Sequence, residues 1–220
     1  MALVAARNEV GLVGATVEAI LTIPSVDRVV VVDDGSTDAT SGEARAAGAT
    51  VLVAPRHFGK GAVLENALAR IPKAGVYLFL DADLGTTAKE AGVLLDAIQQ
   101  GADVAIGVLP REPRHGGFRL VKRLAAAVIE ELSGFRPTEP LSGQRAVRRE
   151  VLDSVRPLAY GFGVEVAMTV DAVRLGFRVV EVPVEMRHEP TGRDLGGFLH
   201  RARQGTDLLA AAAPRFFRLR

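Results

Sequence analysis

The chain has 220 residues, which is long enough for one domain with a sizeable hydrophobic core. It contains no cysteine, which excludes disulfides, thiolate metal sites and a cysteine nucleophile. No apolar run approaches the ~20 residues that span a bilayer, and the start of the chain has no signal-peptide pattern. We therefore expect a cytoplasmic protein.

Charge is distributed unevenly along the chain. Residues 1–110 hold 8 Lys or Arg against 13 Asp or Glu, whereas residues 111–220 hold 19 against 13. The second half is therefore where we expect an anionic partner to be drawn. The basic residues are not interleaved with aromatic ones, as they are in single-strand nucleic-acid binders, so no nucleic-acid partner is expected.

Strand and helix patterns alternate in the first half of the chain. Apolar, Val-rich runs predict strands at residues 2–6, 28–32, 50–54, 76–80 and 104–108. Helical patterns lie between them: a first helix to about residue 23, then 36–48, 60–70 and 87–100. Continuous apolar strands separated by helices predict an α/β fold with a mostly parallel sheet sandwiched by helices.

The second half is less regular. A loop at 111–117 precedes an amphipathic helix at 118–132, and 137–144 is irregular. Helices are predicted at 150–155 and 163–175, a strand at 178–184, a charged loop at 188–194 and a last helix at 195–220 interrupted near Pro214. No repeat or long linker divides the chain, which predicts a single domain over residues 1–220.

Polar residues follow three of the predicted strands: Asn8-Glu9, Asp33-Asp34 and Asp81-Ala82-Asp83. Ligands of parallel α/β sheets bind beyond the carboxyl ends of the strands, so this shared placement predicts one site there. Two carboxylates two positions apart can hold a divalent cation against a diphosphate. The alternative is an Asp-rich turn that merely ends the strand.

Carboxylates at strand ends also suit a nucleoside. Asp33 or Asp34 can accept from a uracil or guanine N–H, Glu9 can accept from a ribose hydroxyl, and Gly35 permits close backbone approach. The alternative is an Asp-Gly turn with Ser36 capping a helix, which accounts for Asp34 but leaves Asp33 unexplained.

Three further residues can serve anions or a metal. Lys60, between two glycines at a helix start, suits a phosphate or a base edge, although the spacing is not that of a P-loop. His188 can supply an imidazole to a metal or can be an ordinary exposed loop histidine. Arg193, after Gly192, offers the paired donors that a phosphate or carboxylate takes.

Four motifs in the first 110 residues resemble the nucleotide-sugar-binding half of family-2 glycosyltransferases, which have the GT-A fold. They are Ala-Ala-Arg-Asn-Glu at 5–9, Val-Val-Asp-Asp-Gly-Ser-Thr-Asp at 31–38, Gly-Lys-Gly-Ala at 59–62 and Leu-Asp-Ala-Asp-Leu at 80–84. The first departs from the Pro-x-Tyr common in the family.

The resemblance implies a UDP- or GDP-sugar donor and a Mg²⁺ or Mn²⁺ ion. It implies that Asp83 ligates the metal and that Asp81 lies against the sugar or ribose. The nucleotide-sugar site implied for residues 1–110 comprises Ala6, Asn8, Glu9, Asp33, Asp34, Gly35, Lys60, Asp81 and Ala82.

The second half is similar to two subgroups that differ in acceptor. Residues 140–146 with 181–184 resemble polyprenyl-phosphate hexosyltransferases of the dolichol-phosphate mannose synthase type. Residues 140–143, 161–165 and 187–188 also resemble glucosyl-3-phosphoglycerate synthases, in which a histidine at the position of His188 completes the metal site. The implied acceptor or phosphate site, in residues 111–220, comprises Ser142, Gly143, Arg145 and Arg193.

Glu165 is the candidate catalytic residue of this half, beside Asp81 and Asp83 in the first. A phosphate acceptor needs no base, whereas a hydroxyl acceptor needs a carboxylate within hydrogen-bond reach. Glu165 begins an apolar helix, where it can serve as that base, order the acceptor or donor sugar, or simply compensate the helix dipole.

The favoured hypothesis is a metal-dependent hexosyltransferase whose acceptor is a polyprenyl phosphate. Transfer to a small soluble acid such as phosphoglycerate is the alternative, and a nucleotidyltransferase or a non-catalytic nucleotide-sugar-binding module ranks lower. The basic, apolar C-terminal segment can lie on the inner face of a membrane. The alternative is that it packs on the domain or at a homodimer interface.

Overall fold

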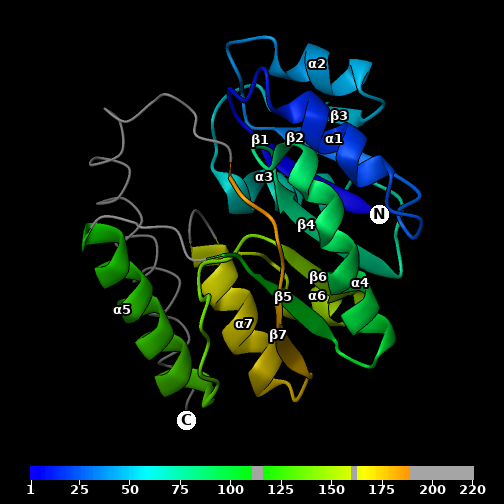
Figure 1. Cartoon of the computed structure of the whole chain (residues 1–220). Coiled ribbons are helices and arrows are strands. Elements are labelled where there is room, and N and C mark those ends of the chain that lie inside the picture. Colours follow the sequence, from blue (N-terminus) through cyan, green and yellow to red (C-terminus); the bar gives the residue numbers. More distant parts are fainter. Residues whose placement is uncertain (111–115, 160–162, 189–220) are drawn as a thin grey trace.

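The computed structural model describes residues 1–110, 116–159 and 163–188 (Figure 1). The first half contains β1 (Ala2–Ala6), α1 (Val13–Leu21), β2 (Val29–Asp33), α2 (Thr40–Ala46), β3 (Thr50–Val53), α3 (Lys60–Leu68), β4 (Val76–Asp81), the 3-10 helix η1 (Gly85–Ala91), α4 (Gly92–Gln99) and β5 (Val104–Val108). The second half contains α5 (Gly116–Ser133), β6 (Arg145–Arg148), α6 (Arg149–Val155), α7 (Val164–Arg174) and β7 (Val179–Pro183).

The strands form one sheet in the order β3-β2-β1-β4-β6-β5-β7. Every neighbouring pair is parallel except those that involve β6, which runs antiparallel to both β4 and β5. β1 lies between β2 and β4, with Ala6 paired to Asp33 and Ala5 paired to Asp81. The sheet therefore brings two of the predicted acidic motifs to the same edge, one on each side of β1.

Helices cover both faces of the sheet (Figure 1). One core cluster joins α1, η1 and α4 to side chains such as Val4 and Leu80, and the other joins α3, α6 and α7 to side chains such as Leu3 and Phe79. Alternate side chains of each central strand enter opposite clusters, which explains why the strand sequences are continuously apolar. The α/β fold class predicted from the sequence is confirmed.

α5 packs outside these layers, against α7. Ala125, Ile129 and Leu132 form a third cluster with Val166 and Val170. α7 thus has one side on the sheet and another side on α5, and it is apolar over most of its surface for that reason.

Several element boundaries differ from the sequence expectations. The predicted helix at 87–100 is a 3-10 helix followed by α4, and the helix expected from Ser36 begins only at Thr40. The loop expected to reach residue 117 ends earlier, because α5 begins at Gly116. The predicted last helix at 195–220 lies outside the described residues.

The strand β6 was missed altogether. Its sequence, Arg-Ala-Val-Arg, is short and has a charged residue at each end, so its pattern does not stand out from an exposed segment. Arg145 nevertheless lies buried, and Ala146 and Val147 pair with β4 and β5 on either side. Tertiary pairing, and not local propensity, makes this segment a strand.

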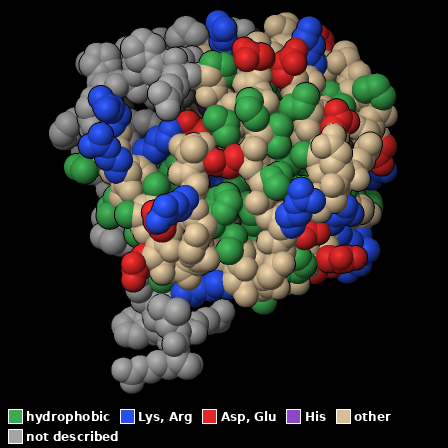
Figure 2. Space-filling model, turned by 60° about the horizontal axis from the view of Figure 1, so that its bottom comes forward, with side chains coloured by type: hydrophobic (Ala, Val, Ile, Leu, Met, Phe, Trp, Pro, Cys, Tyr) green, Lys and Arg blue, Asp and Glu red, His purple; other side chains and the backbone are tan. Residues whose placement is uncertain are grey.

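Within the described residues, no helix has both the length and the apolar character required to cross a bilayer. Figure 2 shows a face on which Lys and Arg side chains are interspersed with Asp and Glu, with hydrophobic side chains between them. The coloured side chains on this face therefore do not form one uniformly positive surface.

Candidate active site

The loop Asp81-Ala82-Asp83 leaves the carboxyl end of β4 and is held from two sides. On one side, the buried Thr16 of α1 donates its hydroxyl to the Ala82 carbonyl at 2.8 Å and accepts from the Gly85 N–H at 2.9 Å. On the other, Gln144 binds Asp81 twice: its Oε1 accepts the Asp81 N–H at 3.0 Å, and its Nε2 donates to Asp81 Oδ2 at 2.6 Å. These bonds fix both the path of the loop and the direction of the first carboxylate.

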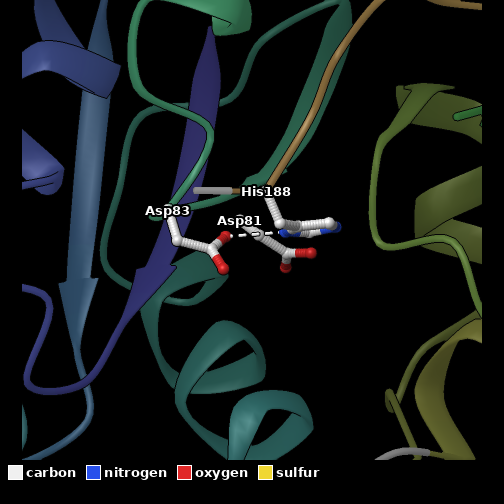
Figure 3. A group of neighbouring side chains, drawn as sticks. All are labelled: Asp81, Asp83 and His188. Atoms are coloured by element: carbon white, nitrogen blue, oxygen red, sulfur yellow. Dashed lines mark hydrogen bonds and ion pairs between the residues drawn. The ribbon is translucent and has the colours of Figure 1, made fainter. Parts of the chain in front are cut away.

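His188 completes a three-residue cluster with Asp81 and Asp83 (Figure 3). One potential ligand atom of each residue lies within 4.8 Å of the others, and His188 Nδ1 is 2.9 Å from Asp83 Oδ1. The chain leaves β7 and returns across the end of β4 at this point, so that residues 105 positions apart in the sequence meet. Two carboxylates and one imidazole, partly exposed, are a donor set that fits Mg²⁺ or Mn²⁺.

Lys60, the first residue of α3, lies between two acidic side chains. Its Nζ is 2.7 Å from Asp81 Oδ1 and 3.0 Å from Glu165 Oε1. Burial acts to lower the pKa of Lys60, but the attraction of Asp81 and Glu165 outweighs it and raises that pKa above its ordinary value. Burial likewise acts to raise the pKa of Asp81, and Lys60 and His188 reverse this and lower it to about 2. The lysine is therefore a cation and Asp81 an anion at neutral pH.

Glu165 lies at the start of α7 and is 6% exposed. Its carboxylate faces Lys60, which places it beside the acidic cluster and not on the outer surface of the helix. Lys60 thus links Glu165 to Asp81, and the predicted catalytic role of Glu165 stays a prediction.

Gly143 lies where any side chain would collide with Lys60 and Asp81. A Cβ there would be 2.5 Å from Lys60 Nζ and 2.9 and 3.0 Å from the two carboxylate oxygens of Asp81. The backbone of the 142–144 loop therefore packs directly on the Lys60–Asp81 pair. Only glycine permits this approach without displacing the pair.

The two aspartates that follow β2 are buried and already accept protein donors. Asp33 Oδ1 accepts from the Ser36 N–H at 2.8 Å, and its Oδ2 accepts from the Ser41 hydroxyl. Asp34 accepts from the N–H groups of Phe58 and Gly59 at 2.7 and 2.9 Å, and its Oδ2 is 2.7 Å from His57 Nδ1. Asp34 therefore ties down the loop that presents Lys60, and the expected contact of either aspartate with a base stays a prediction.

The segments that follow β1 and β2 are bound to each other. Asn8 has φ 55°, a left-handed conformation that asparagine tolerates, and its Oδ1 accepts from the Thr37 N–H at 2.8 Å. The Glu9 N–H donates to Thr40 Oγ1, and the Ala6 carbonyl accepts from the Asp34 N–H.

Gly35, which follows Asp34, packs against the backbone of Arg56 and His57. It has φ 70°, and a Cβ there would lie 2.6 Å from the Arg56 carbonyl carbon. The two segments that carry the predicted nucleoside residues thus form one connected surface at the carboxyl edge of the sheet.

Arg145 is buried and donates its hydrogen bonds within the protein. The side chain is buried, its Nε donates to the Ser142 carbonyl at 2.7 Å, and its Nη1 donates to the Glu165 carbonyl and to Thr169 Oγ1. Burial lowers the pKa of Arg145 to about 10 against the opposing effect of Glu165 and Glu181. The guanidinium joins the 142–144 loop to α7, so this setting favours a structural role, and its contact with an acceptor phosphate stays a prediction.

The sequence interpretation missed two residues of this site. Thr16 lies mid-helix in α1 with no motif around it, so nothing in the sequence marks it. Gln144 adjoins the Ser142-Gly143 motif, and this adjacency is the signal that marks it in the sequence. Arg193, the predicted anion-binding residue, lies outside the described residues.

The chain resembles known proteins in sequence and in fold. The chain is 35% identical over 198 residues to glucosyl-3-phosphoglycerate synthase of Mycolicibacterium smegmatis, covering 78% of this chain and 63% of that protein. It is 34% identical over 129 residues to polyprenol monophosphomannose synthase of the same species, covering 55% and 47%. The chain thus spans less than two thirds of the length of either relative.

A crystal structure of glucosyl-3-phosphoglycerate synthase from Mycobacterium tuberculosis, in complex with Mn²⁺, UDP-glucose and glycerol 3-phosphate, superposes with a TM-score of 0.77. The identity is 28%, and the match covers 96% of this chain and 79% of that one. The family model for glycosyl transferase family 2 matches residues 2–155, which include every strand that carries the acidic motifs. The chain belongs to glycosyl transferase family 2.

Proposed function

We propose that the protein transfers a hexose from a UDP-sugar to a small phosphorylated acid in a reaction that needs Mn²⁺ or Mg²⁺. The cluster of Asp81, Asp83 and His188, adjoining the Lys60–Glu165 pair, is the observation that carries the proposal. It combines a divalent-cation donor set with a positive side chain at the edge of the sheet where ligands bind. The similarity to a synthase crystallised with UDP-glucose and Mn²⁺ supports the same assignment.

The proposed chemistry is the departure of a diphosphate from the sugar carbon. A bound divalent cation supplies positive charge that stabilises the leaving diphosphate. Asp81, Asp83 and His188 are the residues that would hold it. Lys60 adds a second positive charge next to them, and the Gln144 bonds keep the Asp81 carboxylate in one orientation so that little reorganisation is required.

The acceptor assignment favours a small phosphorylated acid over a polyprenyl phosphate. The match to glucosyl-3-phosphoglycerate synthase extends over 78% of this chain, whereas the match to polyprenol monophosphomannose synthase extends over 55%. The position of Glu165 beside Lys60 supports a hydroxyl acceptor, because its carboxylate can accept the proton that a hydroxyl loses. A polyprenyl phosphate would not need this base.

The test is a transfer assay with radiolabelled UDP-glucose, Mn²⁺ and either 3-phosphoglycerate or a short polyprenyl phosphate. We expect labelled product with the soluble acid. Product formed only with the lipid would reassign the acceptor, and no product with either acceptor and no binding of UDP-glucose would refute the proposed function.

Asp83→Asn and His188→Ala provide the matched variants for this assay. The first removes the negative charge of one proposed ligand and the second removes another ligand, both at partly exposed positions. We therefore expect folding to be retained and turnover to fall by more than about a hundredfold. Turnover at the wild-type rate in the Asp83→Asn protein would refute the metal assignment.

A further inference from the structure

Asp81, a member of the proposed metal cluster, is already paired with a positively charged side chain of the protein itself. Asp81 Oδ1 accepts from Lys60 Nζ at 2.7 Å, and Asp81 Oδ2 accepts from Gln144 Nε2 at 2.6 Å. Both oxygens of this carboxylate therefore have a protein donor before any ligand arrives.

A divalent cation on Asp81 would lie only a few ångströms from the Lys60 ammonium. Two positive charges at that separation repel each other, and the partly buried setting screens the repulsion less than water does. The ammonium has no room to move toward the 142–144 loop, since Gly143 packs against it closely enough to exclude even a Cβ. A metal ion that binds the free enzyme thus has to overcome the electrostatic repulsion of the Lys60 ammonium.

A diphosphate changes this balance. Its oxygens carry the negative charge that Lys60 requires, and a phosphate-bound ammonium no longer needs Asp81 as its partner. Glu165, 3.0 Å from the ammonium on the other side, keeps the lysine at the site while it changes partners. The same cation therefore opposes the metal when the nucleotide is absent and assists both ligands when the nucleotide is present.

We propose that Lys60 is an internal counter-ion of Asp81 that disfavours metal binding to the free enzyme and makes metal and nucleoside diphosphate bind cooperatively. The inference rests on the proposed function, because it assumes the metal and UDP sites assigned above. Cooperative binding of this kind is reciprocal: if UDP tightens Mn²⁺ binding by some factor, Mn²⁺ tightens UDP binding by the same factor.

The test measures the dissociation constant of Mn²⁺ by electron paramagnetic resonance of the free ion, with and without saturating UDP. The variants are Lys60→Met and Lys60→Gln, which remove the charge with an apolar and a polar side chain of similar length. Lys73→Met is the control, because Lys73 is an exposed lysine before β4, at the end of that strand opposite Asp81.

Without UDP, we expect both Lys60 variants to bind Mn²⁺ about tenfold more tightly than the wild type, and the control to match the wild type. With UDP, we expect this advantage to disappear, so that the factor by which UDP tightens Mn²⁺ binding is smaller in the variants. Circular dichroism verifies folding, and the polar variant preserves a hydrogen bond to Asp81 if the apolar one perturbs the loop.

Equal or weaker Mn²⁺ binding by both folded variants without UDP would overturn the counter-ion role while leaving the proposed function standing. Absence of Mn²⁺ binding by the wild type even with UDP would overturn the proposed function, and the counter-ion role with it. The two failures are therefore distinguishable in one set of titrations.

Discussion

The side chain of Gln144 binds both the backbone and the side chain of Asp81. The glutamine Oε1 accepts the Asp81 N–H at 3.0 Å, and the Nε2 donates to Asp81 Oδ2 at 2.6 Å. Because Gln144 is itself buried directly before β6, this double contact transmits the position of the antiparallel strand to the carboxylate at the end of β4. The antiparallel strand β6, within an otherwise parallel sheet, thus helps to orient the Asp81 carboxylate.

Gln144→Leu should lower kcat by about 10- to 100-fold with a smaller change in the acceptor KM. The apolar side chain keeps the volume but removes one of the two donors that orient the Asp81 carboxylate, leaving only Lys60. Outer-sphere partners of metal ligands typically contribute this much. Steady-state kinetics with 3-phosphoglycerate as acceptor would measure it. Gln99→Leu, on the exposed end of α4, is the control, and an unchanged kcat in the Gln144 variant would show that the orientation of Asp81 does not matter.

Gly143→Ala should reduce turnover strongly, because the added methyl would collide with both Lys60 and Asp81. Displacing the ammonium by about 1 Å is enough to weaken a pre-organised ion pair, and we expect a loss of about a hundredfold in kcat/KM. Gly42→Ala is the matched control, since a Cβ at Gly42 of α2 meets nothing within 4 Å. Wild-type kinetics in the Gly143 variant would show that the 142–144 loop can yield without consequence.

Arg145→Met should destabilise the fold by about 2–4 kcal/mol while leaving the acceptor KM of the folded protein nearly unchanged. The substitution removes the donor of the buried Ser142 carbonyl and one of the donors of the Glu165 carbonyl. Urea denaturation gives the free energy of unfolding, with the exposed Arg136→Met as the control. A large rise in acceptor KM with little loss of stability would instead support the phosphate contact expected from the sequence.

The lowered pKa of Glu65 predicts how the stability of the fold depends on pH. Partial burial acts to raise the pKa of Glu65, but hydrogen bonds from Arg156 and from the Leu158 N–H outweigh it and lower that pKa below its ordinary value. A carboxylate with a depressed pKa stabilises the fold above its unfolded-state pKa, and the stabilisation is lost as the pH falls through the folded-state value.

Glu65→Gln should therefore be less stable than the wild type at pH 7, and the difference should shrink below roughly pH 5. Thermal unfolding across this pH range measures both, and Glu18→Gln, on the exposed side of α1, controls for the loss of a surface charge. A difference in stability that is constant with pH would contradict the depressed pKa.

The local sequence was enough to predict the parallel strands and the edge of the sheet where the site lies. Runs such as Val29–Asp33 and Val76–Asp81 are apolar on both faces and end in carboxylates, so their type, direction and polar termini are all encoded within a few neighbouring residues. The same locality explains why Asp83 and Lys60 were found, because each follows or begins an element with a recognisable boundary.

Other features depended on residues far apart in the chain. β6 is a strand because β4 and β5 flank it, and Gln144 reaches Asp81 across 63 positions. A sequence shows which donors and acceptors a chain possesses, but long-range pairing decides which of them meet. For that reason the acidic motif and Lys60 were evident from the residues alone, whereas the pairing of Lys60 with Asp81 and the role of Gln144 in orienting Asp81 emerged only from the tertiary structure.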